Sequence, residues 1–258
     1  MTTTIDLNCD VGEREDLAPV VQELLMESIA SASIACGAHA GNEALMRLTL
    51  RQALDHGVIV GAHPGYPDRA NFGRLAVEMP VAELEANIEG QVRVLSKLAA
   101  EAGVELRYVK PHGALYNRAA RDLELARVIA RAISRVDRGL AIVGLAGSPA
   151  LDVWREAAIR VVAEAFADRR YEPDGSLRAR RHPDALLHDP EDAARQALRI
   201  ATRHEVVAWD GSVVKIDAET LCIHGDTPGA DGIARSVRKR LEEAGVQVCP
   251  WRSGAGLG

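Results

Sequence analysis

Histidines gather in the turns of this sequence. Five of the eight lie in segments that contain glycine or proline, and these are His39, His63, His112, His224 and, more loosely, His182. An imidazole exchanges protons near neutral pH and also binds divalent metals. A single such histidine is more often a loop or surface residue, but four at equivalent strand ends favour a functional site.

An acid and a lysine stand beside these histidines. A divalent ion that activates a water could be held by Asp10, His39, His63 and His112. Metal-free acid/base groups are the alternative, since ligands drawn from different strands have no diagnostic spacing. Lysine is scarce beside arginine, and Lys110 stands two residues before His112. Its compact ammonium could meet a carboxylate or a phosphate oxygen.

The elements that must position these side chains alternate along the chain. Short β-branched or apolar runs predict strands near 4–9, 32–36, 58–62, 106–110, 140–145, 161–165 and 221–224. Helical periodicity predicts helices near 18–28, 43–56, 80–102, 122–136, 149–158 and 190–204. Because each crossover carries a helix, the strands should pair in parallel.

The expected fold is α/β, a single-domain β/α barrel of about seven parallel strands over residues 1–258. Nearly every strand ends in His, Asp, Glu or Lys near a glycine. A barrel gathers all strand ends at one mouth, whereas a doubly wound open sheet, the main competitor, uses only those near its switch point. Residues 206–216 predict a β-hairpin decoration. Residues 167–188 lack periodicity, hold five arginines and are expected to form a lid over the mouth.

Composition narrows the class of protein. The chain has 258 residues, 47% of them hydrophobic, and a formal net charge of -6, so no overall basic field attracts nucleic acid or anionic lipid. No hydrophobic signal segment is evident, and we expect a cytoplasmic protein with no membrane partner. The cysteines lack CxxC spacing and are expected to be reduced core residues. Neither GxxxxGK[ST] nor GxGxxG occurs, so a nucleotide would bind in a less stereotyped way.

Five motifs in one order resemble a known family. They are Ile5 to Glu13 (IDLNCDVGE), Ile34 to Gly41 (IACGAHAG), Gly61 to Asp68 (GAHPGYPD), Val109 to Asn117 (VKPHGALYN) and Cys222 to Ala230 (CIHGDTPGA). From about residue 4 to 249 the chain is similar to the LamB/YcsF family. The resemblance implies a barrel of the glycoside hydrolase/deacetylase type. It also implies ATP-dependent opening of 5-oxoproline to L-glutamate, in a complex with two other subunits.

The resemblance and the strand-end positions together give the expected site. The expected catalytic residues are Asp10, His63, Lys110 and His112. The expected substrate- or phosphate-binding residues are His39, Asn117, Glu164, Asp168, Arg169, Arg180, His224 and Asp226. ATP is the expected cofactor, and a divalent metal is left open. A phosphorylated lactam needs cations for phosphate charge, a base for water and a closed environment.

The chain also departs from the family pattern. Ser33, Ala38 and Asn42 stand where the family usually has Asn, Phe and Asp, and Asp184 stands where glycine is usual. These departures leave room for a different substrate. Two alternatives therefore stay open: a metal-dependent hydrolase or deacetylase that acts without ATP, and a non-catalytic subunit that presents 5-oxoproline to a partner.

Overall fold

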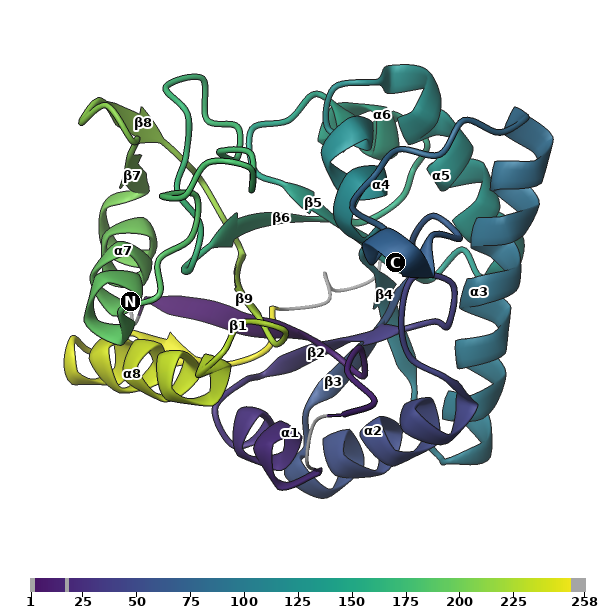
Figure 1. Cartoon of the computed structure of the whole chain (residues 1–258), viewed down its shortest axis with the longest axis horizontal. Coiled ribbons are helices and arrows are strands. Elements are labelled where there is room, and N and C mark those ends of the chain that lie inside the picture. Colours follow the sequence, from purple (N-terminus) through teal and green to yellow (C-terminus); the bar gives the residue numbers. More distant parts are fainter. Residues whose placement is uncertain (1–2, 17–18, 252–258) are drawn as a thin grey trace.

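A computed structural model of the chain describes residues 3–16 and 19–251. Seven parallel strands close into a barrel in the order β1-β2-β3-β4-β5-β6-β9, because β9 pairs with both β6 and β1. These strands are β1 (Thr4–Val11), β2 (Ser31–Ala35), β3 (Ile59–His63), β4 (Leu106–Val109), β5 (Ala141–Leu145), β6 (Val161–Phe166) and β9 (Thr220–His224). Figure 1 shows the ring of strands with helices outside it. The predicted barrel is confirmed.

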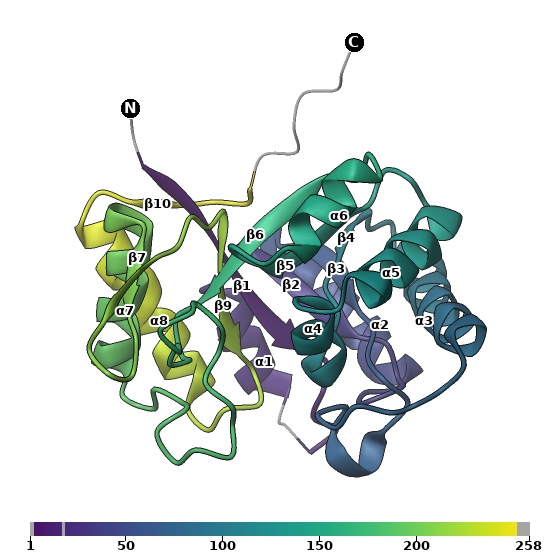
Figure 2. The same cartoon turned by 90° about the horizontal axis from the view of Figure 1, so that it is seen from above.

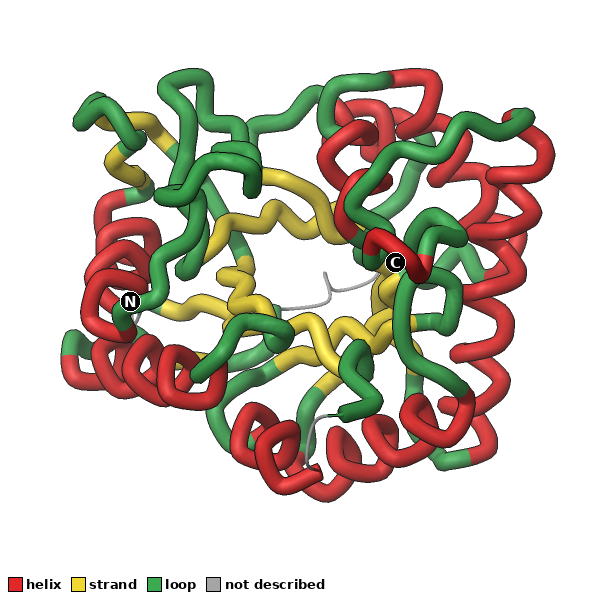
Figure 3. The backbone as a smooth tube through the Cα atoms, viewed as in Figure 1, coloured by secondary structure: helices red, strands yellow, loops and turns green. Residues whose placement is uncertain are grey.

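Helices fill the crossovers and cover the barrel from outside (Figures 2 and 3). They are α1 (Pro19–Met26), α2 (Glu43–His56), α3 (Val81–Glu101), α4 (Gly113–Ala119), α5 (Leu123–Val136), α6 (Ala150–Glu156), α7 (Pro190–Arg203) and α8 (Ala230–Glu243), with a short 3₁₀ turn at Arg69–Asn71. The side chains of Asn42, Asp122 and Asp189 accept backbone N–H groups at the starts of α2, α5 and α7. These caps confirm the predicted helix starts.

Apart from the short 3₁₀ turn, three elements were not among the predicted ones. They are α4, α8 and the two-residue strand β10 (Gln247–Val248), which pairs in parallel with the start of β1. α8 buries Ile233, Val237 and Leu241. Their spacing of four residues is that of one helix face, so this helix was detectable in the sequence.

The predicted hairpin and the segment 167–188, which both interrupt the alternation of strands and helices, contact each other. Strands β7 (Glu205–Val207) and β8 (Val213–Lys215) pair as an antiparallel hairpin, as the sequence predicts. The segment 167–188 has only the isolated bridges of Arg169 with Leu186 and Tyr171 with Leu177. The hairpin meets this segment where the N–H of Trp209 donates to the carbonyl of Tyr171 at 2.9 Å.

Polar side chains continue into the barrel interior below the mouth. The Asp6 carboxylate accepts hydrogen bonds from Ser31, at 2.7 Å, and Thr220. Asn8 then links Thr220 to Glu164, at 2.7 and 2.9 Å. Burial raises the pKa of Asp6 to about 7 despite these hydrogen bonds. The core of this barrel therefore holds a connected polar column beside its apolar layers.

All four cysteines are free. Cys9, Cys36 and Cys222 are buried, as predicted for core residues, whereas Cys249 is only partly buried. Among the helices of the described ranges, none has the length and apolar character needed to cross a bilayer.

Candidate active site

A cavity of about 800 Å³ lies at the carboxyl ends of the barrel strands. Predicted site residues line it, namely Asp10, His63, Lys110, His112, Asn117, Arg169, Arg180 and His224. Residues from the segment 167–188 form part of its wall. Another hollow, of about 430 Å³, lies on the outer face of α5 and α6 and is lined by none of the predicted site residues.

One set of buried side chains surrounds a single ammonium group. The Nζ of Lys110 lies 2.8 Å from Asp10 Oδ1 and 2.8 Å from Glu164 Oε1. It also donates to Asn8 Oδ1 at 3.1 Å and to Cys222 Sγ at 3.0 Å. We call these five residues the lysine cluster. Lys110 is 2% exposed, so the protein itself supplies its partners.

The charges of the lysine cluster stabilise one another. Burial alone would lower the pKa of Lys110, but Asp10, Cys222 and Glu164 outweigh it and hold that pKa well above its usual value. Burial would raise the pKa of Asp10, but the neighbouring His63 and Lys110 hold it well below its usual value. Lys110 is therefore protonated and Asp10 ionised at neutral pH.

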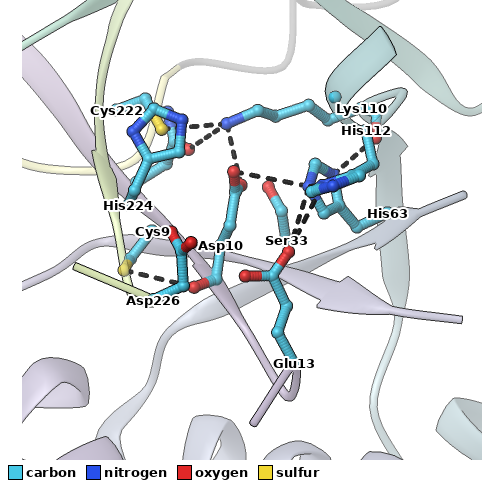
Figure 4. A network of polar contacts seen from close by, with 12 residues as sticks. Cys9, Asp10, Glu13, Ser33, His63, Lys110, His112, Cys222, His224 and Asp226 are labelled. Atoms are coloured by element: carbon cyan, nitrogen blue, oxygen red, sulfur yellow. Dashed lines mark hydrogen bonds and ion pairs between the residues drawn. The ribbon is translucent and has the colours of Figure 1, made fainter. Parts of the chain in front are cut away.

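A second set, the histidine cluster, joins three imidazoles to one carboxylate: Glu13, His39, His63 and His112. Glu13 Oε1 lies 3.3 Å from both His39 Nε2 and His112 Nδ1, and 3.8 Å from His63 Nε2. The facing nitrogens of His63 and His112 are 2.9 Å apart. Figure 4 shows Glu13 pointing to His63 and His112, with Asp10 between them and Lys110. All four side chains are buried.

Backbone groups and packing fix the orientation of the three imidazoles. The Nδ1 of His63 is 2.7 Å from the carbonyl of Lys110, and the Nε2 of His112 is 2.9 Å from the carbonyl of Phe72. The rings of His39 and His112 stack with centroids 3.8 Å apart and planes within 3°. A Cβ added at Gly65 would approach His39 Nδ1 to 2.8 Å, so the close packing there requires glycine.

Burial and hydrogen bonds set the charges of this cluster. Burial lowers the pKa of His39 to about 4, despite the opposing effect of Glu13. Burial acts to raise the pKa of Glu13, but the contacts of its carboxylate with His112 and His39 hold that pKa well below its usual value. Glu13 is therefore a carboxylate, and His39 is neutral at physiological pH.

Glu13 was not among the predicted site residues. Gly12, with φ of +70°, follows the end of β1 and turns the chain there. The N–H of Gly12 donates to the side chain of Gln22 at 3.1 Å, which holds this turn. Four ligand atoms, one each from Glu13, His39, His63 and His112, lie within 4.8 Å of one another. Glu13 thus joins the three histidines, and Asp10, which the sequence analysis placed in this group, contacts one of them, with its Oδ2 3.3 Å from His63 Nε2.

The remaining predicted acids, Asp168 and Asp226, pair with a histidine and an arginine. The Nδ1 of His224 lies 3.0 Å from Asp168, whose carboxylate also accepts the backbone N–H of His224. Burial opposes ionisation of Asp168, but His224 lowers its pKa. Asp226 forms an ion pair with Arg74. Asp168 therefore orients His224, while Asp226 is held beside the cavity wall.

Three arginines of the segment 167–188 line the cavity, namely Arg169, Arg180 and Arg181. Arg169 is 4% exposed, and its Nη2 donates to the carbonyl of Arg178 at 2.7 Å, but its Nε has no partner. Burial first, and the nearby charge of Arg180 second, lower the pKa of Arg169 to about 10. Asn117 donates to the carbonyl of Gly113 at 2.9 Å. Two neighbouring guanidinium groups at a cavity wall are an arrangement that an anion stabilises.

The departures from the family pattern have local roles. Ser33 shares a hydrogen bond of 3.2 Å with the hydroxyl of Tyr108, below the mouth. Asn42 caps α2 by accepting the N–H of Leu45 at 2.9 Å. Asp184 lies 2.8 Å from Arg178 in an ion pair. Nothing in the structure explains the alanine at position 38.

Known proteins resemble this chain over nearly its whole length. The family model described as "LamB/YcsF family" matches residues 5–255. A protein of Chloroflexus aggregans that is named as one subunit of 5-oxoprolinase is 50% identical over 246 residues, which is 95% of this chain and 98% of that protein. A protein of Paracidovorax citrulli with the same name is 47% identical over 249 residues, which is 96% of this chain and 99% of that protein.

A solved structure agrees with these relatives. It is titled as a lactam utilization protein from Thermus thermophilus. Its sequence is 43% identical, its TM-score is 0.87, and the match covers 95% of this chain and 99% of that one. The family match, the close relatives and the shared barrel agree, and we conclude that the chain belongs to the LamB/YcsF family.

Proposed function

We propose that this chain is one of the three subunits of an ATP-dependent 5-oxoprolinase, an enzyme that opens 5-oxoproline to L-glutamate. The observation that carries the proposal is the cavity of about 800 Å³, which joins Asp10, Lys110, His63 and His112 to arginines of the wall. The names of the relatives at 50% and 47% identity support the same activity. A cytoplasmic location, without nucleic-acid or membrane partners, belongs to the same proposal.

The chemistry of a lactam explains why such a site needs both cations and bases. Transfer of the γ-phosphoryl group of ATP to the lactam oxygen releases ADP and makes the ring carbon electrophilic. Water adds to that carbon and the C–N bond breaks, with the ring nitrogen taking a proton. A second water then hydrolyses the acyl phosphate to a carboxylate and phosphate. In a site without a metal, Asp10, His63 and His112 are the groups at the cavity that could take protons from water.

The arginines fit the anionic parts of the substrates. Lys110 already lies within 3.1 Å of four acceptors. The unpartnered Nε of Arg169 and the adjacent Arg180 are therefore better placed than Lys110 to bind a carboxylate or a phosphate. The ammonium of Lys110 instead holds Asp10 and Glu164 in place. The segment 167–188 would act as a lid by carrying these arginines over the cavity.

Reconstitution tests the proposal. The purified chain is mixed with its two partner subunits, ATP and 5-oxoproline, and glutamate and ADP are measured. We expect turnover only in the complete mixture. Equal turnover without this chain, or turnover by this chain alone, would overturn the proposal.

Arg180→Gln tests the proposed anion contact. A charge-assisted hydrogen bond contributes about 1.5–3 kcal/mol, so we expect the KM for 5-oxoproline or for ATP to rise at least about tenfold in the complete complex. Arg203→Gln, on an exposed position at the end of α7, is the matched control and should leave both KM values unchanged. Unchanged KM values in both variants would remove Arg180 from the site.

The histidine cluster favours a second candidate, a metal-dependent hydrolase or deacetylase that acts without ATP. Its four potential ligand atoms within 4.8 Å of one another are the specific observation. Hydrolysis of amide or acetyl substrates by the chain alone, in the absence of ATP, would place this candidate first. Near-normal turnover of the complex with His112→Ala would instead support a non-catalytic substrate-binding subunit.

A further inference from the structure

Two imidazole nitrogens of the histidine cluster face each other at 2.9 Å, and the other nitrogen of each ring faces a backbone carbonyl. A carbonyl oxygen only accepts hydrogen bonds, so His63 Nδ1 must carry the hydrogen that meets the carbonyl of Lys110. By the same reasoning His112 Nε2 carries the hydrogen that meets the carbonyl of Phe72. A neutral imidazole carries one N–H, so His63 Nε2 and His112 Nδ1 present lone pairs to each other at 2.9 Å. Either an extra proton or a metal ion resolves this arrangement.

The position of the carboxylate favours the metal ion. Glu13 Oε1 lies 3.3 Å from His112 Nδ1 and 3.8 Å from His63 Nε2. In a tetrahedral zinc site, bonds of about 2.0–2.2 Å place ligand atoms about 3.3–3.6 Å apart. The two facing nitrogens are 2.9 Å apart, and Glu13 Oε1 is 3.3 Å from that of His112 and 3.8 Å from that of His63. These three distances lie on both sides of the tetrahedral range. Backbone carbonyls that hold the outer nitrogens are the usual supports of metal-binding histidines.

His39 has a different place in the cluster. Its Nδ1 is buried and has no partner. A hydrogen on Nδ1 would leave a buried donor unsatisfied, which costs about 1–3 kcal/mol, so the hydrogen belongs on Nε2. From there it donates to Glu13 at 3.3 Å. His39 therefore orients the carboxylate as a positioning residue, and its own lone pair points away from the three other groups.

No side chain of the protein supplies the missing cation. Within residues 3–16 and 19–251, the Glu13 carboxylate lies near the three histidines and pairs with no lysine or arginine. The nearby ammonium of Lys110 is engaged with Asp10 and Glu164. His63 and His112 line the large cavity, so a cation between them has a side that faces substrate.

We propose that Glu13, His63 and His112 bind a divalent transition metal ion of the zinc type, with His39 orienting Glu13. Two imidazoles and one carboxylate suit zinc and its neighbours better than magnesium, which prefers oxygen ligands. Three protein ligands leave a coordination position for a substrate. Bound there, the ion would act as a Lewis acid toward a carbonyl or phosphoryl oxygen.

Metal binding by the chain is the test. The protein is stripped with a chelator and titrated with Zn²⁺, with Co²⁺ as a spectroscopic probe and with Mg²⁺ as a comparison. We expect one equivalent of Zn²⁺ and a Co²⁺ absorption spectrum of low coordination number. Glu13→Gln and His63→Ala should each weaken Zn²⁺ binding at least about 100-fold. His39→Gln, which keeps a donor to Glu13, should weaken it about 10-fold.

A surface histidine provides the control. His204 ends α7 with φ of +53° and a side chain that is 61% exposed, and asparagine tolerates that backbone conformation. His204→Asn should bind Zn²⁺ as the unaltered chain does. Zn²⁺ binding by Glu13→Gln that equals binding by the unaltered chain would overturn the proposal. So would the absence of Zn²⁺ binding by an unaltered chain that circular dichroism shows to be folded. Either result would leave a shared proton between His63 and His112. Zn²⁺ binding is measured without turnover. The metal proposal can therefore fail while the proposed 5-oxoprolinase activity holds, and the activity can fail while the metal proposal holds.

Discussion

Two groups of side chains at the barrel mouth bring potential metal ligands together, and they differ in what lies among them. In the first, Asp10, Cys222 and His224 have ligand atoms within 4.8 Å of one another, and the ammonium of Lys110 already lies against Asp10 and Cys222, at 2.8 and 3.0 Å. In the histidine cluster, lone pairs and a carboxylate face one another without such a cation.

This difference indicates that the two groups have different roles within one site. The lysine cluster completes its own charge balance. It ties β1, β6 and β9 to the end of β4, because Lys110, the residue after β4, contacts Asp10, Glu164 and Cys222. The histidine cluster is held rigidly by backbone carbonyls and ring stacking, yet its nitrogens lack a shared partner. The first should therefore contribute mainly to stability, and the second mainly to ligand binding.

Lys110→Met gives the largest expected effect. Removal of one partner of a buried ion pair leaves uncompensated charge and costs about 3–5 kcal/mol, here on the carboxylates of Asp10 and Glu164. Urea unfolding measures the loss. Lys97→Met, at a side chain that is 78% exposed, should give no measurable change. A loss below about 1 kcal/mol for Lys110→Met would show that the lysine cluster does not stabilise the fold.

Asp6→Asn tests the polar column below the lysine cluster. The folded pKa of Asp6 is about 7 against the ordinary value of 3.8. Between these values the folded state binds more protons than the unfolded state, so stability falls as pH rises, by up to about 4 kcal/mol. Asparagine keeps an acceptor for Ser31 and Thr220 but does not ionise.

The stability gain of Asp6→Asn over the unaltered chain should therefore grow between pH 4 and pH 7 and then level off. Unfolding by urea at a series of pH values checks this. Asp55→Asn, at an exposed position of α2, is the matched control. A gain that does not change with pH would mean that Asp6 is ionised throughout this range.

Cys222→Ser has the smallest expected effect and separates the two groups most cleanly. A hydroxyl can still accept from Lys110, so the free energy of unfolding should change by about 1 kcal/mol or less. The affinity for Zn²⁺ should stay the same, because Cys222 lies in the group that the ammonium already fills. Loss of Zn²⁺ binding in this variant would move the metal from the histidine cluster to Asp10, Cys222 and His224.

Most of the fold could be predicted from the sequence, because the strands are short, β-branched runs that lie between capped helices. The positions of His63, Lys110 and His224 at the strand ends were equally visible, since parallel strands of a barrel end at one mouth. α8 was missed although Ile233, Val237 and Leu241 repeat at helical spacing. Its many charged residues obscured that narrow apolar face.

The composition of the histidine cluster depends on features that sequence spacing does not reveal. Glu13 belongs to the histidine cluster only because Gly12 turns the chain after β1. Asp10, three residues earlier, also offers a carboxylate, so the sequence did not single out Glu13. The hydrogens on His63 and His112 are set by backbone carbonyls of Lys110 and Phe72. Carbonyl positions depend on tertiary structure and are independent of residue type.

The most direct test of the difference between the two groups is a crystal structure of the chain grown with Zn²⁺, with anomalous data on both sides of the zinc absorption edge. We expect a zinc peak at about 2.0–2.2 Å from Glu13 Oε1, His63 Nε2 and His112 Nδ1, and the ammonium of Lys110 still against Asp10. A map without a zinc peak among these three residues, with the two facing nitrogens still 2.9 Å apart, would contradict the account.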